Sequence, residues 1–427
     1  MQDSKDDWEN ESAIMDEIYR GSTCTISASG AQNSHGGCFT TRNPLIYRPC
    51  IIIGDSERGL LAEGRYLPQE WRGWGTSEDI GRLHSRGWVV QERILSPRTL
   101  HYGSISMSWE CVEHDATERQ PEGDGYDGGL NSGWTFKTYR RPKEAFNNWN
   151  PPAALESGAR PQNAQFTEFF QAWTSVLTAY SQCSLTKGSD KLIAVNGLID
   201  TVSQRTGLNP IAGLWSEYTL PGLMWHTYGP DLMPPEMRCS SWSWAAVDTP
   251  VKFTYKELAI TGRNESTTLS LGMPGIYHRM PMHIKYELTW MTAVLGGKVD
   301  TLPYGAVQDM GYLVVRGPCK KIDLDEIRHD SDFAYQHNPQ ARHESSRFIP
   351  HTLVGTPEHW ALLLARGVGS SNVEDARVDV GLILEPGVTE KSICRRYGYF
   401  EQCYWKGDDY VWFAKDGEEA MKTMTMF

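Results

Sequence analysis

Residues 86–103 concentrate ionisable side chains in a segment that otherwise reads as buried. Glu92 and His101 are its candidate acid–base groups, because burial and a charged neighbour can bring such a pKa close to neutrality. Four further side chains of the segment could hold a substrate or an anion: Arg86, Trp88, Arg93 and Arg98. The same residues could instead form an ion-paired scaffold, since buried arginine–carboxylate pairs commonly hold neighbouring elements together.

A second group of candidate residues lies at 109–115. If strand alternation runs through this segment, Glu110 and His114 point to one face and could share a catalytic pocket. Trp109 is the adjacent candidate for contact with a substrate. The alternative is a solvated strand end, where charged residues are common.

The sequence predicts neither a metal nor a cofactor. Two Cys/His pairs with a two-residue gap occur, at residues 35 and 38 and at residues 111 and 114, but the stretch between them fits no known zinc finger. No G-x-x-x-x-G-K-[ST] loop is present, and no G-x-G-x-x-G segment opens a helix.

The elements that must position these residues alternate between helix and strand. Apolar residues between Trp88 and Leu95 predict a short helix, which Ser96-Pro97 ends before a strand over 99–102. Amphipathic spacing predicts further helices over 3–20, 166–180 and 191–206, with a short strand after the first. Beyond Trp242 the period changes to 2, which predicts a β-rich C-terminal region.

Composition is typical of a folded soluble protein. The net charge is −12, and the basic residues form no stripe, so we predict no nucleic-acid partner. No segment is apolar for long enough to form a membrane helix, and the 9 cysteines lack a C-x-x-C pair, which favours a reducing cytoplasm. The 16 tryptophans predict either dense packing or an indole-lined cavity.

The segment from Arg86 to Gly103 closely resembles the R-G-W-x-x-Q-E-R-x-L-S-x-R-x-L-x-[FY] signature of the fungal heterokaryon incompatibility (HET) domain. Residues 3–19 resemble the acidic helix of that family, with its D-x-x-x-W-x-x-E-x-x-x-M-x-x-I-Y pattern. Downstream, Gly213-Leu214-Trp215 and Ser241-Trp242-Ser243-Trp244 resemble the rear half of many such proteins, and residues 396–401 resemble their usual last strand. Family members carry a S-Y-x-W-G motif and a strand before the acidic helix, so we expect an N-terminally incomplete domain.

The resemblance implies a mixed α+β protein with a truncated, TIR-like α/β part at its N-terminus. We expect a HET-like domain over 1–117, a loop or insertion over 118–162 that could act as a lid, a helical region over 163–247 and a β-rich region over 248–427. Because some TIR domains cleave NAD with a helical glutamate, the resemblance also implies Glu11 as a catalytic candidate.

Three functions stay open at this point. The first is a cofactor-independent acid–base enzyme, such as an epimerase, isomerase or cyclase, acting on a hydrophobic secondary metabolite. The second is an incompatibility effector that triggers cell death through NAD hydrolysis or protein contacts. The third is a scaffold without chemistry. We place the enzyme slightly ahead, on the condition that the Arg, Glu and His side chains converge on a hollow walled by indole rings.

Overall fold

The computed structural model is a mixed α/β fold, as predicted, and its chain divides into two compact units. The first unit comprises Met1–Asn148 with Cys183–Leu185, and the second comprises Trp149–Gln182 with Thr186–Phe427. The residues described are 5–39, 41, 50–52, 64–66, 81–104, 106–118, 121–122, 142–143, 145–146, 164–227, 238–253, 266–269, 280–286, 290–294, 312–323, 347–350, 358–369, 376–387, 392–405, 413 and 421–426. Most of the predicted insertion at 118–162 lies outside these residues. Within them, no helix has the length and apolarity that a bilayer crossing requires.

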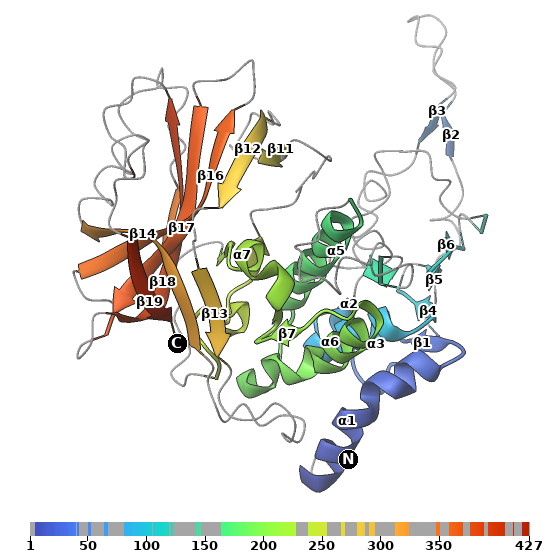
Figure 1. Ribbon diagram of the computed structural model, residues 1–427. Coiled ribbons are helices and arrows are strands. Elements are labelled where there is room, and N and C mark those ends of the chain that lie inside the picture. Colours follow the sequence, from blue (N-terminus) through green and yellow to red (C-terminus); the bar gives the residue numbers. More distant parts are fainter. Residues whose placement is uncertain are drawn as a thin grey trace, which may run out of the picture. The chain divides into compact units, whose positions relative to one another are not determined.

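The described residues of the first unit include a four-stranded sheet and the helices α1, α2 and α3 (Figure 1). The sheet has the order β1-β4-β5-β6, with β1 parallel to β4 and the other pairs antiparallel. A separate antiparallel pair joins β2 and β3. The elements are α1 (Lys5–Gly21), β1 (Thr25–Ser27), β2 (Cys50–Ile52), β3 (Gly64–Tyr66), α2 (Gly81–His84), α3 (Gly87–Leu95), β4 (Arg98–Tyr102), β5 (Met107–Cys111) and β6 (Asp115–Thr117).

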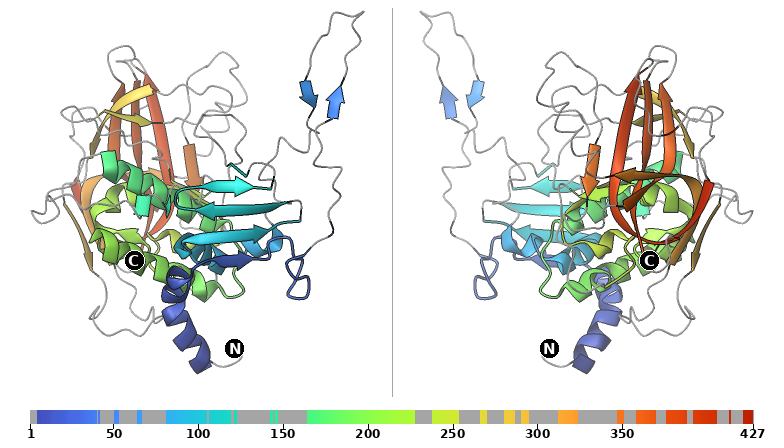
Figure 2. Two further views of the ribbon diagram at one scale, coloured as in Figure 1. Left: turned by 90° about the vertical axis from the view of Figure 1, so that its right-hand side faces the viewer. Right: turned by 90° about the vertical axis from the view of Figure 1, so that its left-hand side faces the viewer.

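The two faces of this sheet differ in burial, and the register explains which side chains share a face. Thr99 pairs with Glu110, and His101 pairs with Ser108, so these four side chains point to the same side. Thr99, His101 and Glu110 are buried there, whereas Trp109 on the opposite face is only half-buried. Thr99 and His101 of the signature therefore lie with Glu110 on the covered face of the sheet, whose strands run side by side in Figure 2.

In the second unit, helices and short strands surround tightly packed indole rings. Gly207, at φ 73°, ends the second long helix in the left-handed conformation that glycine adopts without strain. Among the described residues of this unit, five tryptophans are fully buried: Trp173, Trp215, Trp225, Trp242 and Trp244. The elements are α5 (Ala164–Ser181), η5 (Gly188–Lys191), α6 (Ile193–Thr206), β7 (Pro210–Ile211), β8 (Leu214–Trp215), η6 (Ser216–Tyr218), α7 (Thr219–Gly222), β9 (Trp225–Thr227), η7 (Trp244–Ala246) and β10 (Val251–Phe253).

The remaining strands of the second unit form one nine-stranded sheet. Its pairings β14–β16, β16–β17, β17–β18, β18–β19 and β19–β14 close five strands into a ring. Seven buried residues form an apolar core cluster within this sheet: Ile322, Ala361, Leu363, Ile383, Tyr397, Phe400 and Phe413. The strands are β11 (Ser266–Leu269), β12 (Met280–Tyr286), β13 (Trp290–Val294), β14 (Tyr312–Asp323), β15 (Arg347–Pro350), β16 (Glu358–Gly369), β17 (Ala376–Pro386), β18 (Ile393–Trp405) and β19 (Met421–Met426).

The long, regularly patterned elements agree with the sequence prediction, and several short strands were not predicted. The predicted helices over 3–20, 166–180 and 191–206 correspond to α1, α5 and α6, and the signature folds as α3 followed by β4. The segment 396–401, which resembles the usual last strand of the family, forms part of β18, and β19 follows it and pairs with β14. The Met- and Thr-rich sequence of β19 carries little of the Val, Ile and aromatic enrichment that marks a strand. A TIR-like topology for the N-terminal part stays a prediction.

Candidate functional site

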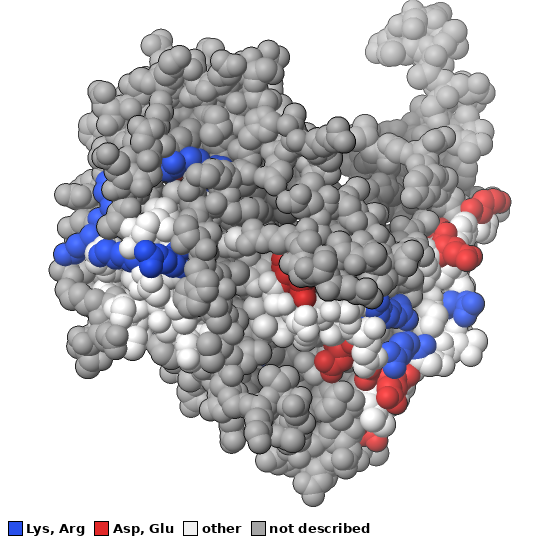
Figure 3. Space-filling view, viewed as in Figure 1, with Lys and Arg blue, Asp and Glu red and all other residues white. Residues whose placement is uncertain are grey.

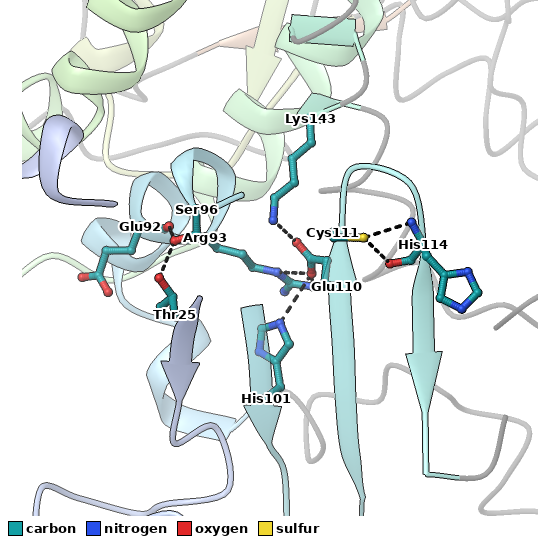
Figure 4. A network of polar contacts seen from close by, with 9 residues as sticks. All are labelled: Thr25, Glu92, Arg93, Ser96, His101, Glu110, Cys111, His114 and Lys143. Carbon is teal, nitrogen blue, oxygen red and sulfur yellow. Dashed lines mark hydrogen bonds and ion pairs between the residues drawn. The ribbon is translucent and has the colours of Figure 1, made fainter. Parts of the chain in front are cut away.

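Glu110 is the centre of a buried cluster of charged residues in the first unit (Figure 4). Its Oε2 accepts a hydrogen bond of 2.7 Å from Nε of Arg93 and a second, shorter one from Nη2 of the same guanidinium. Its Oε1 lies 2.7 Å from Nζ of Lys143. Glu110 is 0% exposed, Lys143 1% and Arg93 5%, so water screens these charges very little.

Two histidines adjoin the cluster. Nε2 of His101 lies 3.5 Å from Oε2 of Glu110, and the ring of His84 packs against the ring of His101 with 5.3 Å between centroids. Burial lowers the pKa of His101, and the charges of Arg93 and Lys143 lower it further, against the opposing effect of Glu110. Burial is also the main cause that lowers the pKa of His84, to about 2. Both imidazoles are therefore neutral near pH 7.

The carboxyl group of Glu110 is held in its ionised form. Burial alone would raise its pKa, but the charges of Arg93 and Lys143 and the hydrogen bond with His101 together outweigh burial and hold the pKa well below its usual value. A group in this state accepts hydrogen bonds from Arg93, forms an ion pair with Lys143 and has no proton to give near neutrality. This arrangement is typical of a structural charge cluster more than of a general acid.

Glu92 does not join this cluster. In Figure 4 its side chain points away from Glu110 and His101. It accepts a hydrogen bond from the hydroxyl of Tyr19 on α1, and burial raises its pKa, opposed by Tyr19 and by the charge of Arg86. Its backbone carbonyl accepts a 2.7 Å bond from Ser96 Oγ, and the Ser96 hydroxyl is 2.7 Å from that of Thr25. The expected pairing of Glu92 with His101 across one cavity is therefore wrong, and Glu92 connects α3 to α1 instead.

The expected pairing of Glu110 with His114 is also wrong. β5 ends at Cys111, so the alternation that would align the two residues stops before His114. His114 lies in the exposed turn that follows, where its backbone N–H donates to Sγ of Cys111 at 3.2 Å.

Only one of the predicted substrate-binding residues lies in the cluster, and that residue is Arg93. Arg86 is exposed, and so is Arg98, whose Nη1 lies 3.4 Å from the carbonyl oxygen of Thr23. Trp88 is half-buried on α3, and Trp109 points to the face of the sheet opposite Glu110. The expected hollow walled by indole rings does not form around the signature in the described residues, since the fully buried indoles belong to the second unit.

Three placements complete the comparison with the sequence prediction. Glu11, the candidate by analogy with NAD-cleaving domains, is exposed on α1. Lys143 and His84 belong to the cluster but were not predicted. Lys143 lies in a stretch rich in Gly, Pro and charge that reads as a loop, and the burial of a lysine in such a stretch has no local sequence signal. Among the described residues, no group of three or more His, Cys, Asp or Glu side chains could hold a metal ion.

Comparison with known proteins agrees with the family resemblance. Residues 1–92 match the family model described as Heterokaryon incompatibility protein (HET). The match includes α1, β1 and the first part of α3, and identifies this part of the chain as HET-family sequence. Neither a curated protein nor a solved structure matches the chain.

Proposed function

We propose that this protein acts in heterokaryon incompatibility as an effector that works through contacts with other proteins. The observation that carries the proposal is the ion pairing of Glu110, at 0% exposure, with Arg93 and Lys143, beyond residues 1–92 that match the HET family model. In this proposal the cluster fixes the signature helix α3 on its sheet, and the recognition surface is displayed outside it.

The contacts of the cluster support a structural role in three ways. Arg93 lies on α3, His101 on β4 and Glu110 on β5. The cluster therefore joins a helix to two strands. Lys143 fastens a segment distant in sequence to the same carboxylate. Each partner is at least nine-tenths buried, and removing one leaves the other charges without compensation in a low-dielectric interior.

An acid–base enzyme acting on a hydrophobic metabolite is the second candidate. The contact between a neutral His101 and an ionised Glu110 favours it, because a carboxylate can orient an imidazole that serves as a base. Burial weighs against it, since His101 is only 5% exposed and a substrate must come within hydrogen-bond distance of the group that takes its proton.

Induced expression of the complete chain in a filamentous fungus tests the proposal. We expect loss of growth or viability on induction of the native sequence. Arg93→Ala should unfold the first unit and thereby abolish this effect. Circular dichroism and protease resistance of the purified protein measure the unfolding. Arg98→Ala, which removes an exposed arginine of the same signature, is the matched control and should retain both fold and effect.

The readouts separate the proposal from its competitors. NAD is measured in the induced cells and with the purified protein, and its consumption would replace protein contacts with hydrolysis as the effector mechanism. Turnover of hydrophobic fungal metabolites by the purified protein, abolished in a folded His101→Asn variant, would establish the enzyme. Normal growth in cells that accumulate folded native protein contradicts the effector proposal.

A further inference from the structure

The chain leaves the second unit for three residues and then returns to it. α5 ends at Ser181 and η5 begins at Gly188, and of the residues between them only Cys183–Leu185 belong to the first unit. We call residues 180–191 the crossing loop and Cys183–Leu185 its tip. The chain therefore passes between the two units twice within this loop.

The tip caps the signature helix α3. Gly87, the first residue of α3, donates its backbone N–H to the carbonyl of Ser184 at 3.0 Å. Ser184 donates its own backbone N–H to the carbonyl of Ser85 at 2.6 Å. Arg86, the N-cap residue of α3, makes no side-chain capping bond. The carbonyl of Ser184 therefore accepts from one of the N–H groups that a helix leaves open at its start.

The tip also adjoins the histidine pair beside the Glu110 cluster. The thiol of Cys183 donates to the carbonyl of His84, with 3.5 Å between sulfur and oxygen. The ring of His84 packs against the ring of His101, which contacts the carboxylate of Glu110. α3 carries Arg93, which pairs with the same carboxylate. The tip therefore supports the cluster at two points, the start of α3 and residue 84.

The base of the crossing loop is fixed inside the second unit. The hydroxyl of Tyr180 donates to the carbonyl of Lys191 at 2.6 Å, which ties the end of α5 to the end of η5. Tyr180 is 2% exposed and Lys191 5%, so water competes little for this bond. Beside it, Oγ of Ser181 accepts from the backbone N–H of Val251 on β10 at 2.9 Å. A shift of α5 against η5 therefore also moves the ends of the segment that carries the tip.

We propose that the crossing loop couples the two units, so that a change in the second unit reaches α3 and the Glu110 cluster through the tip. Ser85, Arg86 and Ser184 are exposed, and Figure 3 shows charged side chains of both signs at the surface over the region of α1 and α3. Because water competes for the bonds of the tip, the tip can detach while the buried base stays closed. Detachment removes the cap of α3, so α3 opens more often. The inference does not depend on the effector function proposed above.

Peptide-resolved hydrogen exchange of the complete chain tests the role of the tip. Ser184→Pro removes the N–H that donates to Ser85, so we expect the amides at the start of α3 to exchange at least about tenfold faster, and those of β4 and β5 to follow. Ser184→Ala keeps the backbone N–H and is the matched control, which should exchange like the native protein. Unchanged exchange of α3 in a folded Ser184→Pro variant overturns the proposal.

Tyr180→Phe tests the coupling without a change in the first unit. It removes the hydroxyl that bonds to Lys191, so we expect faster exchange in residues 181–191 and, through the tip, at the start of α3. In a Ser184→Pro background the same substitution should leave α3 unaltered, since the tip is already detached. Tyr218→Phe, at another buried tyrosine of the second unit, is the control and should not change α3 exchange. If Tyr180→Phe does not affect α3, or affects it equally in both backgrounds, the coupling is wrong.

A reversible crosslink keeps the proposal testable if Ser184→Pro unfolds the first unit. Arg86 and Ser184 form a parallel β-bridge, and neighbouring strands lie about 4.8 Å apart, which suits a disulfide. In the oxidised Arg86→Cys/Ser184→Cys variant, α3 should exchange more slowly and should not respond to Tyr180→Phe. The reduced form of the same variant is its control, and peptide mapping verifies which cysteines are joined. Equal exchange of α3 in the two forms overturns the proposal.

Discussion

The Glu110 cluster of the first unit and the indole-rich part of the second unit bury polar groups in different ways. The first encloses ionised side chains that pair with one another, with Glu110 between Arg93 and Lys143. In the second, two buried indoles donate to backbone carbonyls at 3.0 Å, Trp225 to Trp242 and Trp244 to Gly213.

A buried arginine sharpens the contrast between the units. Arg396 is 1% exposed, and its Nη1 donates to the carbonyl of Leu223 at 2.8 Å, while Nη2 donates to the carbonyl of Trp225. Its guanidinium also lies 3.7 Å from the centre of the Trp225 ring. The first unit therefore satisfies its buried cations with a carboxylate, and the second satisfies this one with backbone dipoles and an aromatic face. The stability of the structure around Glu110 should respond to charge and pH, and that of the structure around Arg396 and the buried indoles to shape.

Removing the central carboxylate should have the largest effect. Glu110→Ala leaves Arg93 and Lys143 buried without a counter-charge, so we expect a loss of about 3–5 kcal/mol in the unfolding free energy of the first unit. Hydrogen exchange of peptides from β4 and β5 measures this loss separately from the second unit. Asp248→Ala, which breaks a pair with Arg238 at a largely exposed carboxylate, is the control and should cost under about 1 kcal/mol. Equal protection in the Glu110 variant and the native protein would contradict the structural role of the cluster.

Acid should destabilise the first unit in two stages. His84 and His101 have lowered pKa values in the folded protein, so below about pH 6.5 the unfolded chain binds protons that the folded chain does not, and stability falls with pH. Glu110 also has a lowered pKa, so its contribution is complete above about pH 4.3 and is lost below it. Urea unfolding at a series of pH values should show the unfolding free energy falling as the pH drops below about 6.5. In a folded His84→Gln/His101→Gln variant, this fall with pH should be less steep. An unchanged slope would mean that other groups titrate.

More of the fold than of the candidate site could be predicted from the sequence. Local periodicity located α3 and α5, because each buries a continuous apolar stripe, and it also located α1, although Ile14 and Ile18 of α1 are exposed. The signature contains Arg86, Arg93 and Arg98 as equivalent candidates for binding a substrate or an anion. Only the rotation of α3 on its sheet decides which arginine meets a carboxylate. Likewise, the pairing of Thr99 with Glu110 brings Glu110 near His101, and strand register is set by contacts that a single sequence does not display.

A change in side-chain shape should lower the stability of the second unit, although by less than the loss of the Glu110 charge lowers the stability of the first. Gly213 has φ 82°, and a Cβ there would lie 2.7 Å from Nε1 of Trp244 and 3.1 Å from Cδ2 of Leu192. We expect Gly213→Ala to cost about 1–3 kcal/mol, because it combines a strained backbone with a displaced indole. Hydrogen exchange of the peptides around α6 and η7 measures the effect. Gly21→Ala, where a Cβ meets nothing within 4 Å, should change the stability by less than about 1 kcal/mol.

The smallest expected effect concerns the bond between α1 and the signature helix. Tyr19→Phe removes the hydroxyl that donates to Glu92 while keeping the ring, so α1 should loosen by about 1 kcal/mol and the rest of the first unit should keep its stability. Exchange of the α1 amides measures this, and Tyr102→Phe on β4 is the matched control at a half-buried tyrosine away from Glu92. Loss of this bond also leaves the Glu92 carboxyl buried with less support for its charge, so its pKa should rise further, which NMR titration of the carboxyl carbon can follow. If α1 exchange is unaltered while the Glu92 pKa rises, the bond stabilises the charge of Glu92 without holding the helix.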